Sequence, residues 1–162
     1  MTDLIFLKLG GSLLTDKTGV EALRVDILSR VADEIAAARA AAPSLRLVLG
    51  HGSGSFGHVA AARHGTRAGV GSAGQWAGFA EVCDAAARLN RHVVAALLAA
   101  GVPAIGLPPS SSAVVADGRI IRMATTPIAA ALAAGIVPVV FGDVAFDTIR
   151  GGIIVSTEEV ME

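Results

Sequence analysis

Short, continuously apolar segments alternate with longer helical patterns along this chain, and this alternation most constrains its fold. We expect strands at residues 4–9, 45–49, 104–107 and 137–141, because each segment is short and almost free of polar side chains. Apolar positions spaced by threes and fours predict helices at residues 25–42, 75–100 and 126–134. A short helix near residues 58–64 and a hairpin over residues 114–123 complete the pattern. Buried strands separated by helices predict an α/β fold, a mostly parallel sheet sandwiched by helices.

The length and composition of the chain indicate one compact domain without a broad charged surface. Its 162 residues correspond to about one ordinary domain, and 53% of them are apolar. The net charge of −1 excludes the basic field that nucleic acid or an anionic membrane would require. No apolar stretch reaches the roughly 20 residues of a membrane helix, and the N-terminus lacks the pattern of a signal peptide. The single cysteine, Cys83, excludes an internal disulfide and a multi-cysteine metal site, so we expect a cytoplasmic protein with no metal held by its own side chains.

A glycine-rich loop directly follows the second apolar segment and is the strongest candidate for binding phosphate. Residues 50–58 read GHGSGSFGH, and the segment ends on His58. Glycines allow successive backbone N–H groups to turn toward one point, and such a nest at a helix N-terminus attracts anions. We therefore expect this loop to bind phosphate, with His58 as a side-chain donor at its rim or, alternatively, as a structural cap.

Loops after three of the expected strands are predicted to meet at one site. They begin at Gly10, Gly50 and Gly142, and loops at the carboxyl ends of parallel strands lie at the same edge of a sheet. Lys8 lies one residue before the end of the first strand, where its ammonium group is costly unless it meets an anion or snorkels to the surface. Lys17 could place a second cation over the same point, or it could be an ordinary surface lysine.

The glycine loop also matches a dinucleotide-binding fingerprint, and this alternative is weak. Residues 52–57 fit the pattern G-x-G-x-x-G, which would suggest an oxidoreductase. That fold requires an acidic residue at the end of the next strand, whereas Glu81 and Asp84 lie inside the long helical pattern. Titration with NADH would test this alternative.

Several segments together resemble the amino acid kinase superfamily, in particular its isopentenyl phosphate kinase branch. They occur in the order and spacing of that family, from residue 4 to the end of the chain. The segments are Lys8-Leu9-Gly10-Gly11-Ser12 with Asp16-Lys17, residues 51–58, Pro109-Ser110-Ser111, residues 137–143 and Ser156-Thr157-Glu158-Glu159. The histidine that ends the glycine loop is typical of this branch and of the related fosfomycin kinases.

The resemblance implies ATP-dependent phosphorylation of isopentenyl phosphate to isopentenyl diphosphate, a step of alternative mevalonate routes to isoprenoids. The implied cofactors are ATP and the Mg²⁺ carried by the nucleotide. The implied partner is a second copy of the chain in a homodimer. A fosfomycin-like phosphonate, another small phosphate monoester, or a non-catalytic anion-binding role for the module are the alternatives.

The resemblance also assigns roles to individual residues. The catalytic group would comprise Lys8, Lys17 and His58, with Lys8 along the transferred phosphoryl group and His58 on the acceptor phosphate. The ATP phosphates would be lined by Lys8, Leu9, Gly10, Gly11, Ser12, Lys17 and Gly54. The acceptor would contact Ser53, Gly57, His58, Gly142 and an apolar slot of Phe79, Val82, Ile128 and Phe141. These apolar residues could equally belong to the core. Glu158 stands where the family commonly has an aspartate that orients the lysines.

The family continues for roughly another hundred residues beyond the point that corresponds to Glu162, a domain's worth of chain. We therefore expect residues 1–162 to be an N-terminal acceptor-phosphate-binding domain that lacks a C-terminal ATP-binding part. We also expect little or no turnover by these residues without that part.

Overall fold

The computed structural model describes residues 4–65 and 69–162, except for the side chains of residues 58–60. The elements in the first half of the chain are β1 (Leu4–Leu9), α1 (Gly11–Leu14), α2 (Val25–Ala41), β2 (Arg46–His51), α3 (Gly54–His64) and α4 (Ala73–Ala99). Those in the second half are β3 (Ala104–Gly106), the short 3₁₀ helix η2 (Pro109–Ser111), β4 (Ala113–Ala116), β5 (Arg119–Met123), α5 (Thr126–Ala133), β6 (Val137–Phe141), β7 (Asp143–Asp147), β8 (Gly151–Val155) and α6 (Thr157–Met161).

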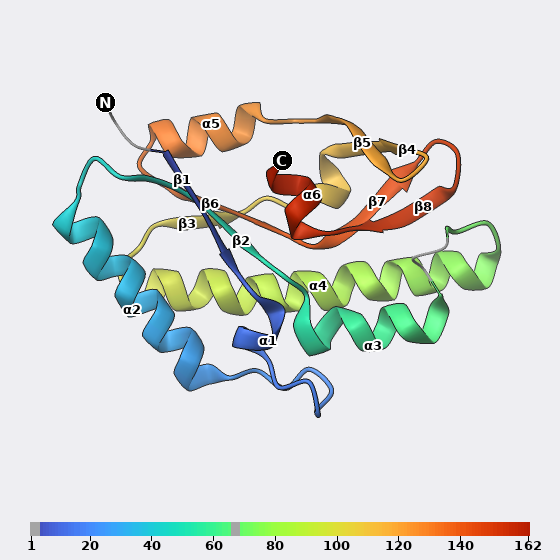
Figure 1. The fold of residues 1–162 in the computed structure, drawn as a ribbon, viewed down its shortest axis with the longest axis horizontal. Coiled ribbons are helices and arrows are strands. Elements are labelled where there is room, and N and C mark those ends of the chain that lie inside the picture. Colours follow the sequence, from blue (N-terminus) through green and yellow to red (C-terminus); the bar gives the residue numbers. More distant parts are fainter. Residues whose placement is uncertain (1–3, 66–68) are drawn as a thin grey trace.

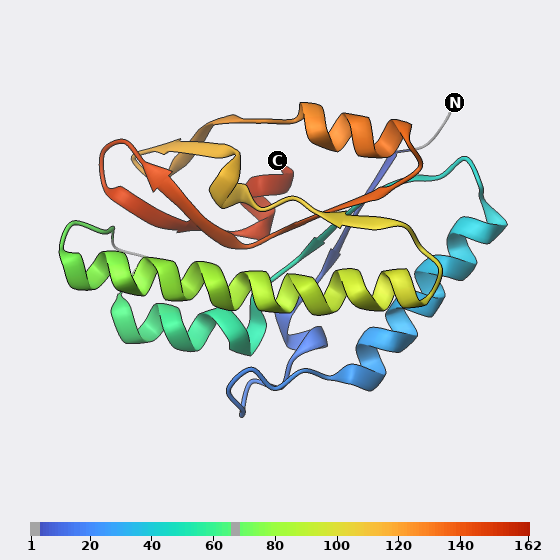
Figure 2. The same ribbon diagram turned by 180° about the vertical axis from the view of Figure 1, so that it is seen from behind.

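A parallel sheet of order β1-β2-β6-β3 forms the centre of the fold. Helices α2 and α4 cover one face of this sheet, and α5 lies on the opposite face (Figures 1 and 2). The core between the sheet and α2 and α4 is built from aliphatic side chains, including Ile35, Leu49, Val93 and Val139. The predicted α/β fold with a mostly parallel, helix-covered sheet is therefore confirmed.

A second sheet of order β5-β4-β7-β8 extends the molecule beyond the parallel one. It contains the expected hairpin β4–β5, and its β7–β8 hairpin covers residues for which the sequence pattern predicts no element. The chain passes from β6 in the first sheet to β7 in the second through Gly142. This crossing places the second sheet directly beside the carboxyl ends of the central strands.

The carboxyl ends of three central strands lie side by side. Leu9 of β1 pairs with His51 of β2, and His51 pairs with Phe141 of β6. The amide of Gly52 donates to the carbonyl of Leu9 at 3.2 Å, and that of Gly142 to the carbonyl of His51 at 3.1 Å. The loops after these strands therefore begin at one point, as the strand pattern predicts.

Helix α3 begins earlier than the sequence predicts. The expected helix near residue 58 begins at Gly54, so most of the glycine-rich segment is helical. The amides of Phe56 and Gly57 donate to the carbonyl of Ser53 at 3.1 and 3.2 Å. The phosphate-loop candidate is therefore a two-residue connection, Gly52 and Ser53, that leads into a helix N-terminus.

Candidate functional site

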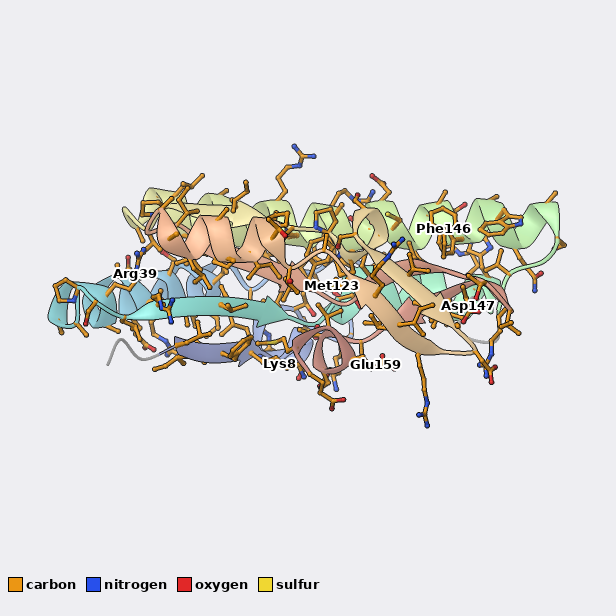
Figure 3. All side chains as sticks on the ribbon, turned by 90° about the horizontal axis from the view of Figure 1, so that it is seen from above. Lys8, Arg39, Met123, Phe146, Asp147 and Glu159 are labelled. Atoms are coloured by element: carbon orange, nitrogen blue, oxygen red, sulfur yellow. The ribbon has the colours of Figure 1, made fainter. Side chains whose placement is uncertain are left out.

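A cavity of about 570 Å³ opens where the central strand ends meet the second sheet and α6. It is lined by Lys8, Gly10, Gly11, Ser12, Lys17, Gly52, Ser53, Gly54, Gly118, Gly142, Arg150, Glu158 and Glu159, together with residues 153–157. In Figure 3, Lys8 and Glu159 lie near the centre of the molecule, whereas Phe146 and Asp147 lie toward the far end of the second sheet. Most of the residues expected to bind ATP phosphates therefore share this cavity.

Two glycines bring the first strand's loop against the start of α3. A Cβ on Gly11 would lie 2.5 Å from the amide nitrogen of Gly54, and one on Gly54 would lie 2.8 Å from the carbonyl oxygen of Gly11. Gly54 also has φ of +51°, a left-handed conformation that side chains disfavour. The close approach of the two backbones thus depends on glycine at both positions, and it leaves their amides beside the cavity.

The buried residues Thr15 and Ser55 join these two segments by hydrogen bonds. The Thr15 hydroxyl donates to the carbonyl of Gly11 at 2.8 Å and accepts from the amide of Ser55 at 2.9 Å. The Ser55 hydroxyl accepts from the amide of Ala22 at 3.1 Å, in the loop that carries Lys17. Sequence reasoning missed both residues, since a single threonine or serine carries no signal until the fold shows what it contacts.

The ammonium group of Lys8 contacts the Glu158 carboxylate across the cavity. Glu158 lies in the first turn of α6, whose start is fixed by a capping box between Ser156 and Glu159. The hydrogen bond from Lys8 lowers the pKa of Glu158, with a further contribution from a backbone amide. Glu158 is therefore ionised at neutral pH and holds the lysine at the cavity wall.

Part of the expected acceptor site gathers at a second, much smaller cavity beside the first. It has a volume of about 20 Å³, room for about one water molecule, and is lined by Ser53, Gly57, Ala61, Val82, Ala86, Gly142, Asp143 and Ile154. Phe79 packs with Val82 in an adjoining apolar cluster that also contains Val144. Among the predicted acceptor residues, Ser53, Gly57, Val82 and Gly142 line this cavity, and Phe79 adjoins it.

The other two apolar candidates, Phe141 and Ile128, do not line that cavity. Phe141 is fully buried in β6 and stacks on His51, with ring centroids 5.3 Å apart. Ile128 lies on α5 and lines a separate groove with Leu107 and Met123. Helix α5, which carries Ile128, covers the opposite face of the sheet from α4, which carries Phe79 and Val82 (Figure 1).

His58 lies within α3, about one turn after the start of the helix. Its side chain lies outside the described part of the structure, so its role in acceptor binding stays a prediction. Leu9, also expected near the ATP phosphates, is 6% exposed and contributes to the core beneath the cavity.

Two buried polar residues lie under the site. His51 is fully buried, its ring nitrogens lie 3.1 Å from the Gly52 carbonyl and the Asn90 side-chain oxygen, and burial lowers its pKa. Asp143 is 1% exposed, and one of its oxygens accepts from the amide of Ser110 at 3.1 Å. Its other oxygen has no partner among the described residues, and burial raises the pKa of the carboxyl group.

Neither a metal-ligand cluster nor a membrane-spanning helix occurs in the part of the chain that the structure describes. Among these residues no three histidine, cysteine, aspartate or glutamate side chains are grouped to hold a metal ion. Across residues 4–65 and 69–162, no helix combines the length and the apolarity needed to cross a bilayer.

A family model described as "Amino acid kinase family" matches residues 3–161. Relatives of the chain include proteins named isopentenyl phosphate kinase. The one from Methanothermobacter thermautotrophicus is 39% identical, and the match covers 91% of this chain and 56% of the relative. For the one from Methanocaldococcus jannaschii the identity is 32%, with 98% of this chain and 62% of the relative covered. The chain thus spans little more than half the length of these relatives.

Solved structures show the same likeness. An X-ray structure of isopentenyl phosphate kinase superimposes with a TM-score of 0.90 at 36% identity, covering 98% of this chain and 66% of the other. A structure titled as an isopentenyl phosphate kinase substrate complex gives 0.84 at 28% identity, covering 98% and 63%. An aspartate kinase from Synechocystis gives 0.62 at 20% identity, covering 95% and 24%, which shows the shared fold.

Proposed function

The chain belongs to the amino acid kinase family, and from that premise we propose that it is the acceptor-binding domain of an isopentenyl phosphate kinase. The observation that carries the proposal is the cavity in which Lys8, Lys17 and the glycine backbone at the start of α3 face the same space. The names of the relatives support the choice of acceptor.

The proposed reaction brings two anions together, and the positive groups at the cavity would reduce the repulsion between them. Transfer of a phosphoryl group from ATP to a phosphate monoester requires in-line positioning and neutralisation of negative charge. Lys8 and Lys17 supply positive charge at the cavity wall, and the N-terminus of α3 supplies backbone N–H groups and the positive end of a helix dipole. Mg²⁺ carried by the nucleotide would neutralise further phosphate charge when bound.

Individual residues take roles that follow from their positions. Lys8, held by Glu158, would lie along the transferred group, and Lys17 would contact the donor phosphates. Gly10 and Gly11 would line the donor side, because a phosphate can approach bare backbone closely. Ser53, Gly57 and His58 would bind the acceptor phosphate, with Phe79 and Val82 beside its apolar tail.

The wider setting of this function is also part of the proposal. We place the reaction in the cytoplasm, in a mevalonate-type route to isoprenoids, with the domain contributing to a homodimer. A C-terminal ATP-binding part, which the length of the relatives supports, would complete the nucleotide site.

Acceptor binding tests the proposal. Isothermal titration of the 162-residue chain with isopentenyl phosphate should show one site, whereas isopentenol, which lacks the phosphate, should not bind. His58→Ala should weaken binding about tenfold or more, because a hydrogen bond to a charged group contributes about 1.5–3 kcal/mol. His92→Ala, at an exposed histidine on α4, is the control and should leave the affinity unchanged.

Three results would contradict parts of the proposal. Equal affinity of His58→Ala and the parent chain would remove His58 from the acceptor site. Tighter binding of a small phosphonate than of isopentenyl phosphate would move the assignment to a phosphonate kinase. No binding of any phosphate monoester would overturn the acceptor-binding role.

A further inference from the structure

The loop between α1 and α2 carries Lys17 and is closed at its base by backbone hydrogen bonds. The amide of Asp16 donates to the carbonyl of Ala22 at 2.8 Å, and Thr15 and Leu23 form an isolated antiparallel bridge. The Asp16 carboxylate accepts from the amide and the hydroxyl of Thr18 at 2.9 and 2.7 Å. Lys17 therefore lies in a loop whose two ends are joined by backbone hydrogen bonds.

Arg88 on α4 contacts this loop from outside the cavity. Nε of Arg88 donates to the Glu21 carboxylate at 3.1 Å, and a second guanidinium nitrogen contacts the other carboxylate oxygen. Such two-point pairing fixes orientation as well as distance. Asp84, one turn earlier on α4, contacts the same guanidinium group and holds it toward the loop.

The backbone conformation of Glu21 supports a positioning role for this contact. Glu21 has φ of +51°, a left-handed conformation that is costly for a residue with a Cβ atom. The strain persists because neighbouring contacts over-determine it: Ala22, the next residue, donates to Ser55 at the start of α3. The ion pair with Arg88 thus holds the loop at the residue whose strained backbone conformation would otherwise relax.

The same face of α4 also holds α3. Glu81, two turns before Arg88, contacts His64 at 2.7 Å and Arg63 at 3.8 Å, both near the end of α3. A groove of about 140 Å³ lies between the loop and the two helices. It is lined by Val20, Glu21, Phe56, Arg63, Glu81, Asp84, Ala85 and Arg88. Helix α4 is therefore in a position to set the Lys17 loop and the N-terminus of α3 relative to each other.

We propose that Arg88 and Glu21 are positioning residues, whose ion pair fixes the loop so that the ammonium group of Lys17 reaches the anion in the main cavity. The proposal rests on the phosphate-binding role given to that cavity above. Neither residue lines the space next to Lys8, so they act on bound phosphate through Lys17.

Lysine labelling with and without an anion tests this proposal on the 162-residue chain. Each lysine is acylated with a trace of an amine-specific reagent, with or without tripolyphosphate, and the rates at Lys8 and Lys17 are measured by peptide mass spectrometry. In the parent chain tripolyphosphate should protect both lysines. In Arg88→Ala the protection of Lys17 should fall about tenfold, a size typical of residues coupled in one ion-pair network, while Lys8 stays protected.

Three further variants separate positioning from general stability. Glu21→Gln should behave like Arg88→Ala, and Arg88→Lys, which keeps a positive charge between Glu21 and Asp84, should retain part of the protection of Lys17. Arg91→Ala, at an exposed arginine of α4, is the matched control and should change neither lysine. Loss of folding would lower the protection of both lysines together, so retention of Lys8 protection identifies a local effect.

Hydrogen exchange at the amide of Asp16, measured without anion, makes failure of this proposal distinguishable from failure of the phosphate site. Faster exchange in Arg88→Ala together with selective loss of Lys17 protection supports the positioning role. Unchanged exchange, or equal protection of Lys17 in the parent chain and Arg88→Ala, overturns it. If tripolyphosphate protects neither lysine in the parent chain, the phosphate site itself is wrong and the positioning role is overturned with it.

Discussion

At the scale of single residues, one carboxylate joins the two hairpin turns beside the cavity. Asp147 is 4% exposed and ends β7. Its oxygens accept hydrogen bonds from the backbone amides of Asp117, Gly118, Ile149 and Arg150, at 2.7–3.2 Å. Burial raises the pKa of the group, but these four bonds outweigh that effect and lower it to about 2.

Asp147→Asn should therefore destabilise the fold in a pH-dependent way. At neutral pH we expect the free energy of unfolding to fall by about 1–3 kcal/mol, because four backbone amides lose a charged acceptor. The contribution of a carboxylate with a lowered pKa is present above its unfolded value and is lost as pH falls. The difference between variant and parent should thus shrink as pH falls from 3.8 toward about 2.

Urea unfolding at a series of pH values measures this effect. Asp33→Asn, at an exposed aspartate of α2, is the control and should show little change at any pH. A constant difference between Asp147→Asn and the parent chain across this range would contradict the assigned cause.

At the scale of elements, α3 and α4 pack so closely that the position of the glycine segment depends on them. Gly78 of α4 faces His64 of α3, and a Cβ there would lie 2.3 Å from the His64 Cβ and Cγ atoms. Gly74, one turn earlier on the same helix, has no neighbour within 4 Å of its would-be Cβ. The same substitution at these two glycines therefore has opposite expected effects.

Gly78→Ala should destabilise the protein and Gly74→Ala should not. Alanine favours a helix over glycine by about 1 kcal/mol, and this gain applies wherever space allows. At Gly78 overpacking against His64 should exceed that gain and lower the free energy of unfolding by about 1–2 kcal/mol. Thermal unfolding gives the melting temperature of each variant. Equal melting temperatures would show that α3 and α4 can move apart to make room for the added methyl group.

The elements also show where sequence patterns are sufficient. The apolar stripe of α4 predicts residues 75–100, and the helix runs from Ala73 to Ala99, because its pattern faces one continuous core. Residues 137–141, in contrast, are predicted as a strand and Gly142 as the start of a loop, yet the chain continues after a break at Gly142 as β7 of the second sheet. The break depends on the pairing of β7 with β4 and β8, which no local pattern contains.

At the scale of the whole molecule, the edge of the central sheet carries an unusual apolar strand. β1 is one of the two edge strands of this sheet, and Leu4, Ile5, Phe6 and Leu7 are 41%, 46%, 54% and 37% exposed. In Figure 3, β1 is the blue strand that runs along one side of the central sheet, next to β2. An exposed apolar edge strand offers unpaired backbone groups to another chain.

We expect the 162-residue chain to self-associate through β1. Sedimentation velocity should show an average mass that rises with concentration, and Phe6→Lys should reduce this rise because a charged side chain blocks strand pairing. Ile149→Lys, which removes a more exposed apolar side chain in the β7–β8 turn at 71% exposure, is the control. An equal effect of both substitutions would indicate general hydrophobic association instead of pairing at the edge.

The sequence by itself determined the strands of the central sheet and the helices that cover it, the convergence of three strand-end loops and the kinase-family motifs. These features are local or periodic, so they can be recognised from residue types and spacing. Only the tertiary structure decided that α3 begins at Gly54, that Ile128 and Phe141 lie away from the small cavity beside Ser53, and that Thr15, Ser55, Glu21 and Arg88 surround the Lys17 loop. Those features depend on contacts between residues far apart in the chain, such as the 67 positions between Glu21 and Arg88, and such contacts exist only once the chain has folded.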